Sequence, residues 1–99
     1  MGKDLSKVVE FLSKKLSERI KKGDLTVRDY PETEPCIVIR YKANDVRPSF
    51  NYGRWASRND TMQIESSEEL GMNYVNYCIS EMAGEMEDKG INPYEYLEV

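Results

Sequence analysis

The segment CIVIRYKA, residues 36–43, is the feature that most constrains the fold, because it alternates apolar and charged side chains and so predicts a β-strand. Ile39 and Tyr41 would share one face of that strand with Ile37, while Arg40 and Lys42 would share the other face with Val38. A strand with one apolar face needs a second layer to cover that face. The chain must therefore supply helices or another sheet.

Two amphipathic helices are predicted, one before this strand in the chain and one after it. Residues 4–22 should form the first, with Asp4 as its N-cap and Gly23 as a left-handed stop. Its apolar stripe is Leu5, Val8, Val9, Leu12, Leu16 and Ile20. The second should run over 67–89, from a capping box in SSEE to Gly90. Its most apolar stripe is Met72, Val75, Ile79, Met82 and Met86.

Three further segments, 25–30, 50–57 and 61–65, are predicted to be strands, and the tail NPYEYLEV is predicted to form a short helical turn capped by Asn92. The chain is short enough for one domain over 1–99. We expect an α+β two-layer sandwich, in which an antiparallel meander of three or four strands carries the N-terminal and C-terminal helices on one face. The other face of the sheet is then left for water or a partner.

The absence of histidine excludes Ser-His and Cys-His catalysis and histidine-ligated metal sites. Cys36 and Cys78 form no CxxC pair, and we expect both to be small buried groups in a reducing compartment. Neither a glycine-rich phosphate loop nor a calcium loop is present. We therefore expect a non-enzymatic protein without metal or cofactor.

No apolar run reaches the length of about 18 residues that a membrane span needs, and the first residues lack the apolar stretch of a signal peptide. A cytoplasmic location and no membrane partner are expected. The net charge of −4 is uneven along the chain: residues 1–23 carry +4, residues 24–60 carry zero and residues 61–99 carry −8. This gradient favours either attraction between the two ends of the chain or the approach of a charged partner.

A basic, aromatic segment crosses the middle of the chain, with cations and rings interleaved between 40 and 58. Its candidate binding residues are Arg40, Lys42, Arg47, Arg54, Trp55 and Arg58. Such a mixture is typical of surfaces on which single-stranded nucleic acid binds, because cations follow phosphates and rings stack on bases. The alternative is an ordinary strand whose rings enter the core; alternation then leaves one or two rings exposed.

The order helix, strands, helix resembles that of double-stranded-RNA-binding domains. Those domains carry a lysine cluster at the start of the last helix, where this chain has ESSEELG, and acids repel phosphate. We therefore assign no family on this basis.

A second candidate surface is an acidic, tyrosine-bearing stripe of the second helix. Its residues are Leu70, Tyr74, Tyr77, Glu81, Glu85 and Asp88. Tyrosine brings a large contact area at a low entropy cost, which suits a protein partner. The alternative is that the tyrosines pack against the C-terminal tail, and the sequence leaves open which stripe of this helix faces the sheet.

Three hypotheses of function follow. The leading one is a small protein-binding module, in particular an inhibitor or accessory factor of a nucleic-acid-handling protein, of the kind that phages and mobile elements encode. The second is a nucleic-acid-binding module that uses the basic, aromatic segment. The third is a structural or assembly subunit that self-associates; the sequence does not indicate an oligomeric state.

Overall fold

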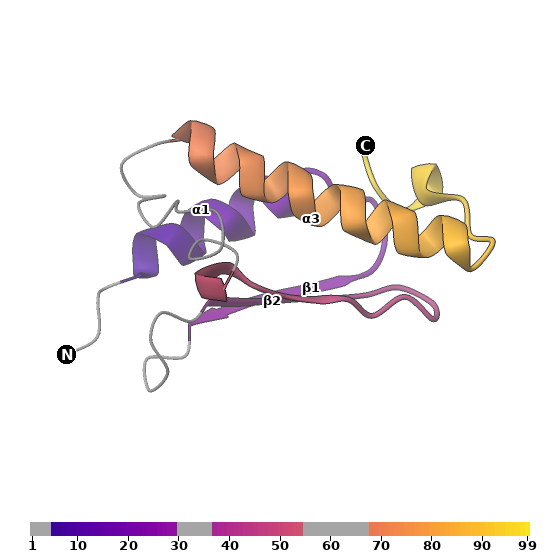
Figure 1. The fold of residues 1–99 in the computed structure, drawn as a ribbon, viewed down its shortest axis with the longest axis horizontal. Coiled ribbons are helices and arrows are strands. Elements are labelled where there is room, and N and C mark those ends of the chain that lie inside the picture. The colour runs from indigo at the N-terminus through magenta and orange to yellow at the C-terminus, as the bar shows by residue number, and fades with distance from the viewer. Residues whose placement is uncertain (1–4, 30–36, 55–67) are drawn as a thin grey trace.

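The structure is a computed structural model and describes residues 5–29, 37–54 and 68–99 (Figure 1). Its elements, in chain order, are α1 (Ser6–Ser17), β1 (Asp24–Asp29), β2 (Ile37–Lys42), β3 (Ser49–Asn51), α3 (Glu68–Asp88) and the 3₁₀ turn η2 (Pro93–Glu95). Helices combined with an antiparallel sheet confirm the α+β class. The predicted fourth strand, 61–65, lies outside the described residues.

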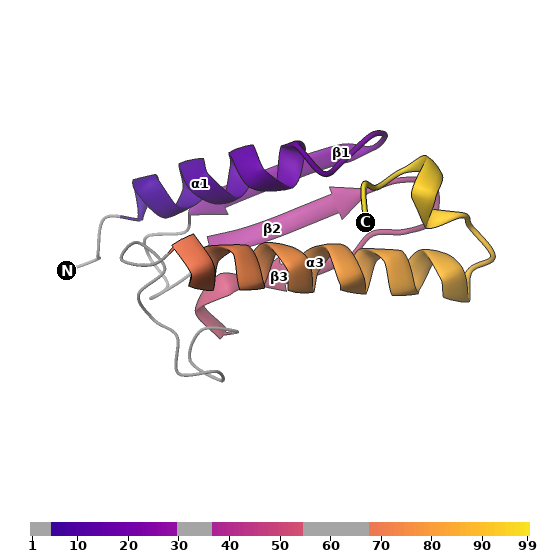
Figure 2. The same ribbon diagram turned by 90° about the horizontal axis from the view of Figure 1, so that it is seen from above.

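The described sheet has three antiparallel strands in the order β1-β2-β3, so β2 is the central strand. Thr26 of β1 lies opposite Arg40 of β2, which in turn lies opposite Ser49 of β3. Both helices lie on the same side of the sheet, with α1 above β1 and α3 running along β3 (Figures 1 and 2). The opposite face of the sheet carries neither helix.

The core lies between this sheet and the two helices. Ile37, Ile39 and Tyr41 of β2 have 0–2% of their surface exposed, as the alternation of this strand predicts. Leu12 and Leu16 of α1 are fully buried in the same core cluster. Four of the five residues of the predicted apolar stripe of α3 are also buried, namely Val75, Ile79, Met82 and Met86, and Met72 is half-buried.

Helix α1 ends at Ser17, five residues before its predicted end. The following residues pair instead with the C-terminal tail: Ile20 and Leu97 form an antiparallel bridge, and the Lys21 N–H donates to the Tyr96 carbonyl at 2.7 Å. These tail contacts give the backbone partners that a longer helix would have supplied. Gly23 has the predicted positive φ, +108°, but it belongs to the turn before β1 rather than to a helix end. The predicted cap, Asp4, lies outside the described residues.

The end of α3 and the tail match the sequence prediction. Gly90 has a φ of +73°, and the Ile91 N–H donates to the Met86 carbonyl at 2.8 Å. The Gly90 N–H donates to the Glu87 carbonyl at 3.0 Å, which completes a Schellman motif. In η2 the Asn92 side chain accepts from the Tyr94 N–H at 3.1 Å, as expected of a capping residue.

The third strand is much shorter than predicted. β3 ends at Asn51, and residues 52–54 turn into helical conformation, so the prediction of a strand over 50–57 is wrong for these residues. The Asn51 side chain accepts from the Arg54 N–H at 2.9 Å, which is the geometry of a helix cap. The hydrogen bond of the Asn51 side chain thus stabilises a helical turn at residues 52–54 in place of a longer strand. Among the residues that the structure describes, no helix has the length and apolarity to cross a bilayer.

Candidate binding surface on the outer face of the sheet

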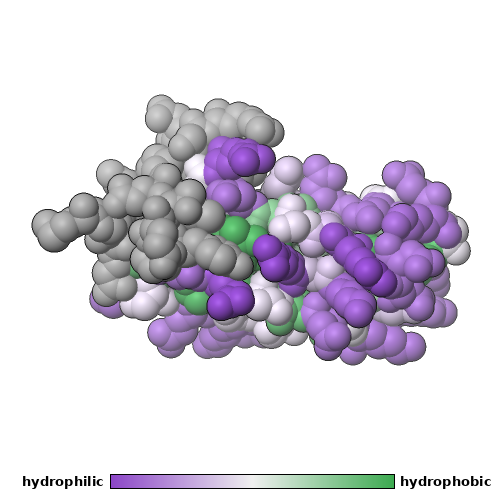
Figure 3. Space-filling view, turned by 90° about the horizontal axis from the view of Figure 1, so that it is seen from below, coloured by the Kyte–Doolittle hydropathy of each residue, from purple (hydrophilic) through white to green (hydrophobic). Residues whose placement is uncertain are grey.

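The outer face of the sheet is polar and carries an excess of cations. Thr26, Arg40 and Ser49 form a row across the three strands, and all three are exposed. Arg28 and Lys42 are exposed on the same face, on either side of that row. Figure 3 views the molecule from this side and shows hydrophilic residues over most of it, with a smaller apolar area beside the residues drawn in grey.

Two adjoining hollows lie on this side of the molecule. The first has a volume of about 380 Å³ and is lined by Asp24, Thr26, Arg40, Tyr41, Lys42, Arg47, Pro48 and Ser49. The second has a volume of about 390 Å³ and is lined by Val38, Arg40, Ser49, Phe50, Asn51, Arg54, Tyr74 and Tyr77. They share Arg40 and Ser49, so together they extend from the β2–β3 turn to the flank of α3.

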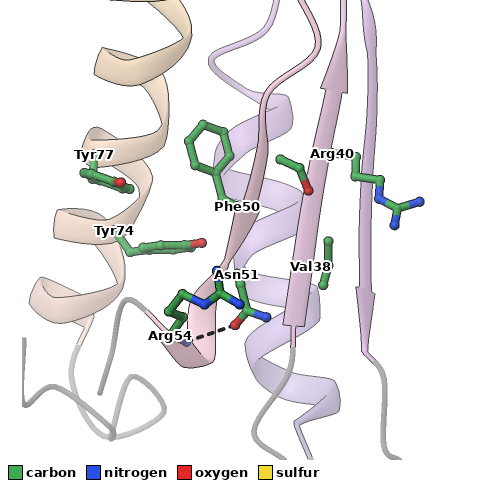
Figure 4. Close-up of a pocket in the computed structure, with 8 residues that line it drawn as sticks. Val38, Arg40, Phe50, Asn51, Arg54, Tyr74 and Tyr77 are labelled. Carbon is green, nitrogen blue, oxygen red and sulfur yellow. Dashed lines mark hydrogen bonds between the residues drawn. The ribbon is translucent and has the colours of Figure 1, made fainter. Parts of the chain in front are cut away.

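The hollows bring together four of the six residues predicted for the basic, aromatic segment. We call Arg40, Lys42, Arg47 and Arg54 the basic surface. All four are exposed, and Asp24 is the only acid among the described lining residues. In Figure 4 the Arg40 side chain extends over β1, whereas Arg54 lies beside Asn51 on the side nearer α3. The cations are therefore spread along the hollows and do not converge on one point.

Sequence reasoning found the cations but missed their polar neighbours. Thr26 and Ser49 line the hollows because the strand register places them on either side of Arg40. That register depends on pairing between distant segments, which the sequence pattern of each strand does not contain. Trp55 and Arg58, the other two predicted residues, lie outside the described residues.

A cluster of aromatic rings closes the space between β3 and α3. Phe50 meets Tyr77 edge-to-face with ring centroids 6.0 Å apart, and Tyr52 meets Tyr74 in the same way at 5.4 Å. Tyr74 and Tyr77 stack at 6.1 Å. Phe50, Tyr52 and Tyr74 are buried, whereas Tyr77 is 37% exposed. Phe50, Tyr74 and Tyr77 line the second hollow (Figure 4), and of the four rings in the cluster only Tyr77 exposes a substantial part of its surface.

The prediction that Tyr74 belongs to an exposed acidic stripe of α3 is wrong. Tyr74 is fully buried, so it is unavailable to a partner of the folded monomer. The buried face of α3 is wider than one stripe, because the helix also packs against Tyr52, just after β3. Tyr77, Glu81 and Asp88 remain exposed. Both tyrosines meet rings from β3 and the following turn, rather than the tail that the alternative named.

Two other predicted members of that stripe are only partly available. Glu85 is half-buried and pairs with Lys89 at 3.5 Å. Leu70 belongs to α3, but its side chain lies outside what the structure describes. The surface left to this stripe is therefore smaller and less aromatic than predicted.

Burial keeps the groups beneath the hollows in their neutral forms. It raises the pKa of the Tyr74 phenol far above its usual value and raises the pKa of the Cys78 thiol to about 12. A thiol in this state is a poor nucleophile, so Cys78 acts as a small buried group, as predicted. Cys36 lies outside the described residues. No three acidic or cysteine side chains within 5–29, 37–54 and 68–99 gather closely enough to hold a metal ion.

Other cations of the chain are engaged by the C-terminal tail. Arg19 donates from Nε to the Glu98 carbonyl at 2.7 Å and from a terminal nitrogen to the Asn76 side chain at 2.9 Å. Lys21 donates from Nζ to the Tyr94 carbonyl at 3.0 Å. The basic segment 1–23 and the acidic segment 61–99 are thus in contact, but these hydrogen bonds go to carbonyl and amide oxygens rather than to carboxylates.

Comparison with protein-family models, with curated proteins and with solved structures found no match to this chain.

Proposed function

We propose that this chain is a non-enzymatic protein-binding module that holds an acidic segment of a partner protein on its basic surface. The observation that carries the proposal is the gathering of four cations along two adjoining hollows, which extend over the outer face of the sheet to the flank of α3, with Asp24 as the only acid among the described lining residues. Complementary charge of this kind speeds encounter and favours partners of the opposite sign.

The shape of the basic surface suits an extended segment. Arg47 lies at one end, Arg54 at the other, and Arg40 lies where the two hollows join. Arginine can donate two parallel hydrogen bonds to a carboxylate, which gives geometric specificity as well as charge. Exposed Tyr77 adds an aromatic contact at the α3 end.

The side chains of the hollows suit binding rather than catalysis. Arginine and lysine hold anions, but neither exchanges a proton readily at neutral pH unless its pKa is strongly lowered. The buried titratable groups that line the hollows, Tyr41 and Tyr74, have pKa values raised by burial and so stay protonated. This distribution supports the proposal of a binding module.

The acidic stripe of α3 takes a secondary place in this proposal. An inhibitor or accessory factor of a nucleic-acid-handling protein would use exposed acids to face a basic groove. Glu81 and Asp88 are available for that contact, and Tyr77 lies on the same helix, but Tyr74 is not available. The basic surface is therefore the larger candidate.

Nucleic acid is the alternative ligand for the same surface, since arginine also binds phosphate. Stacking on bases needs accessible rings, with about 1–3 kcal/mol for each stacked base. Phe50 and Tyr52 are buried, which leaves Tyr77 as the accessible ring of the aromatic cluster. This is why we favour a protein segment.

The test compares two probes on three proteins. A fluorescent peptide of alternating glutamate and serine and a fluorescent oligothymidylate are titrated by anisotropy at low and moderate salt. The proteins are the wild type, the double variant Arg40→Glu/Lys42→Glu, and the control Lys7→Glu/Lys14→Glu, which makes the same change of charge at exposed positions of α1.

We expect the wild type to bind the peptide more weakly as salt rises. The Arg40→Glu/Lys42→Glu variant should lose at least about tenfold in affinity, or about 1.4 kcal/mol, and the control much less. Equal losses in both variants would mean a response to net charge alone and would contradict the proposal. Tighter binding of oligothymidylate, with the same dependence on Arg40 and Lys42, would establish the nucleic-acid alternative instead.

A further inference from the structure

Among the described strands β1 is an edge strand of the sheet, with α1 above it (Figure 2). It pairs with β2 over six consecutive residues, Asp24–Asp29, without a bulge. Proline, lysine and bulges commonly keep a sheet edge from pairing with another chain, and β1 contains none of these three; its charged residues are Asp24, Arg28 and Asp29. The opposite rim, β3, is three residues long and is preceded by Pro48.

Along β1 the backbone N–H and C=O groups of successive residues point alternately towards β2 and away from it. The Tyr41 N–H of β2 donates to the Pro48 carbonyl, so the odd-numbered residues of β2 point their backbone groups towards β3. The backbone N–H and C=O groups of Arg40 therefore point towards β1, where Arg40 pairs with Thr26. It follows that the N–H and C=O groups of Leu25 and Val27 point away from β2, towards the outer side of this rim.

The side chains of β1 are self-complementary around Thr26. In an antiparallel pairing of two copies centred on Thr26, each Leu25 lies opposite Val27 of the second copy, and the two exchange backbone hydrogen bonds. Asp24 lies opposite Arg28 of the second copy, and Thr26 lies opposite itself. One register thus matches opposite charges, apolar residues and the outward-pointing backbone groups at once.

Burial along β1 supports the same pairing. Leu25 and Val27 face the helical layer yet are only half-buried, whereas Ile39 and Tyr41, on the same face of β2, are 0% and 2% exposed. A second β1 strand laid along this rim would cover the exposed parts of Leu25 and Val27. Asp24, Thr26 and Arg28 are exposed on the outer face, where their counterparts would meet.

We propose that this chain forms a symmetric dimer in which the β1 strands of two copies pair antiparallel around Thr26. The described three-stranded sheets of the two copies then join into one continuous six-stranded sheet. The symmetry axis is perpendicular to that sheet, so both helical layers lie on one side and both basic surfaces lie on the other. This proposal concerns assembly and does not depend on which ligand the basic surface holds.

Charge variants of β1 test the register directly. Arg28→Asp alone would place acids opposite acids across the two-fold axis, and Asp24→Arg alone would place arginines opposite arginines. Mixing the two variants would place the acids of one opposite the arginines of the other. The control is Lys14→Glu, at an exposed position of α1. Association is measured by sedimentation equilibrium from about 1 µM to about 1 mM, which spans weak and moderate dissociation constants.

We expect the wild type and the control to dimerise with similar dissociation constants. Each single variant should dissociate at least about tenfold more readily, and the equimolar mixture should form a heterodimer. Circular dichroism checks that both variants keep their fold. A wild type that is monomeric throughout the range, or single variants that dimerise as tightly as the wild type, would overturn the proposal.

Amide hydrogen exchange gives a second readout that does not depend on variants. The Leu25 and Val27 amides should become protected as the protein concentration rises, while the Thr26 amide, which points towards β2, should be protected at every concentration. Exchange of Leu25 and Val27 that is equally fast at low and high concentration would contradict the pairing.

Discussion

The two faces of β2 differ sharply although their residues alternate along one short strand. Ile37, Ile39 and Tyr41 are almost completely buried beneath the helices, whereas Arg40 and Lys42 are exposed on the outer face. The inner face contributes apolar burial, which is the main source of folding stability. The outer face contributes little to stability and is free to carry charge. Neighbours in sequence can therefore have separable roles.

The largest expected effect contrasts two adjacent residues. Ile39→Ala should lower the free energy of unfolding by about 2–5 kcal/mol, because it removes fully buried apolar volume and leaves a cavity. Arg40→Ala should change it by no more than about 0.5 kcal/mol, because Arg40 is exposed. Urea unfolding of both variants measures the difference. Similar losses in the two variants would break the distinction between the faces.

The next effect concerns the turn that leads into β1. Gly23→Ala should cost about 1–3 kcal/mol, because Gly23 has a φ of +108° and an added Cβ would lie 2.8 Å from Tyr41 Cε2 and 2.9 Å from the Lys42 carbonyl oxygen. Gly84→Ala is the matched control: Gly84 lies within α3, and nothing lies within 4 Å of its added Cβ. This control should stabilise the protein by about 0.5–1 kcal/mol. Thermal melts of both variants measure these changes in stability. A Gly23→Ala variant as stable as the wild type would contradict the close packing described at Gly23.

A smaller effect is expected at the hydroxyl of Tyr41. It donates to the Lys22 carbonyl at 2.7 Å, so Tyr41→Phe should cost about 1 kcal/mol. Burial, with a contribution from Tyr96, also raises the pKa of Tyr41 from 10.0 to about 12. Because the folded state holds this proton more tightly than the unfolded state, the resulting stability is present below pH 10.0 and is lost as pH rises to about 12.

Urea midpoints below pH 10.0 and between pH 10.0 and about 12 measure this loss. The pKa of Tyr74 is raised in the same direction, so Tyr41→Phe should reduce the alkaline loss without abolishing it. An alkaline loss that is identical in the wild type and in Tyr41→Phe would show that Tyr41 is not responsible.

The smallest effect on stability is expected at Arg47. Its side chain is exposed at one end of the basic surface, so Arg47→Ala should change the free energy of unfolding by less than about 0.5 kcal/mol. The same variant should weaken binding of the glutamate–serine peptide and make that binding less sensitive to salt. Anisotropy titrations at two salt concentrations measure both quantities. Unchanged affinity and salt dependence would remove Arg47 from the basic surface.

Local patterns predicted the elements whose structure is determined locally. The alternation in β2 placed Ile39 and Arg40 on opposite faces, and Gly90 and Asn92 indicated the end of α3 and the cap of η2. Two predicted element ends were wrong. The distant C-terminal tail bonds the backbone of Arg19, Lys21 and Lys22, where a longer α1 was predicted. A local cap, in which the Asn51 side chain accepts from the Arg54 N–H, ends β3 early.

The candidate surface was predictable in composition but not in layout. The sequence identified Arg40, Lys42, Arg47 and Arg54, which the fold places along the same pair of hollows. It did not reveal that Tyr74 packs against Tyr52, since that contact joins α3 to a turn more than 20 residues earlier in the chain. A helix periodicity shows which residues share a stripe, but not how wide the buried face becomes after packing.

The most direct test of the proposed division between the two faces is a titration of the isotopically labelled protein with the glutamate–serine peptide, followed by backbone amide chemical shifts. We expect the largest shifts at Thr26, Arg40 and Ser49, the row that crosses the outer face, and small shifts along the exposed stripe of α3. Shifts confined to that stripe, around Tyr77 and Glu81, or no shifts at any peptide concentration, would contradict the proposal that the outer face is the binding surface.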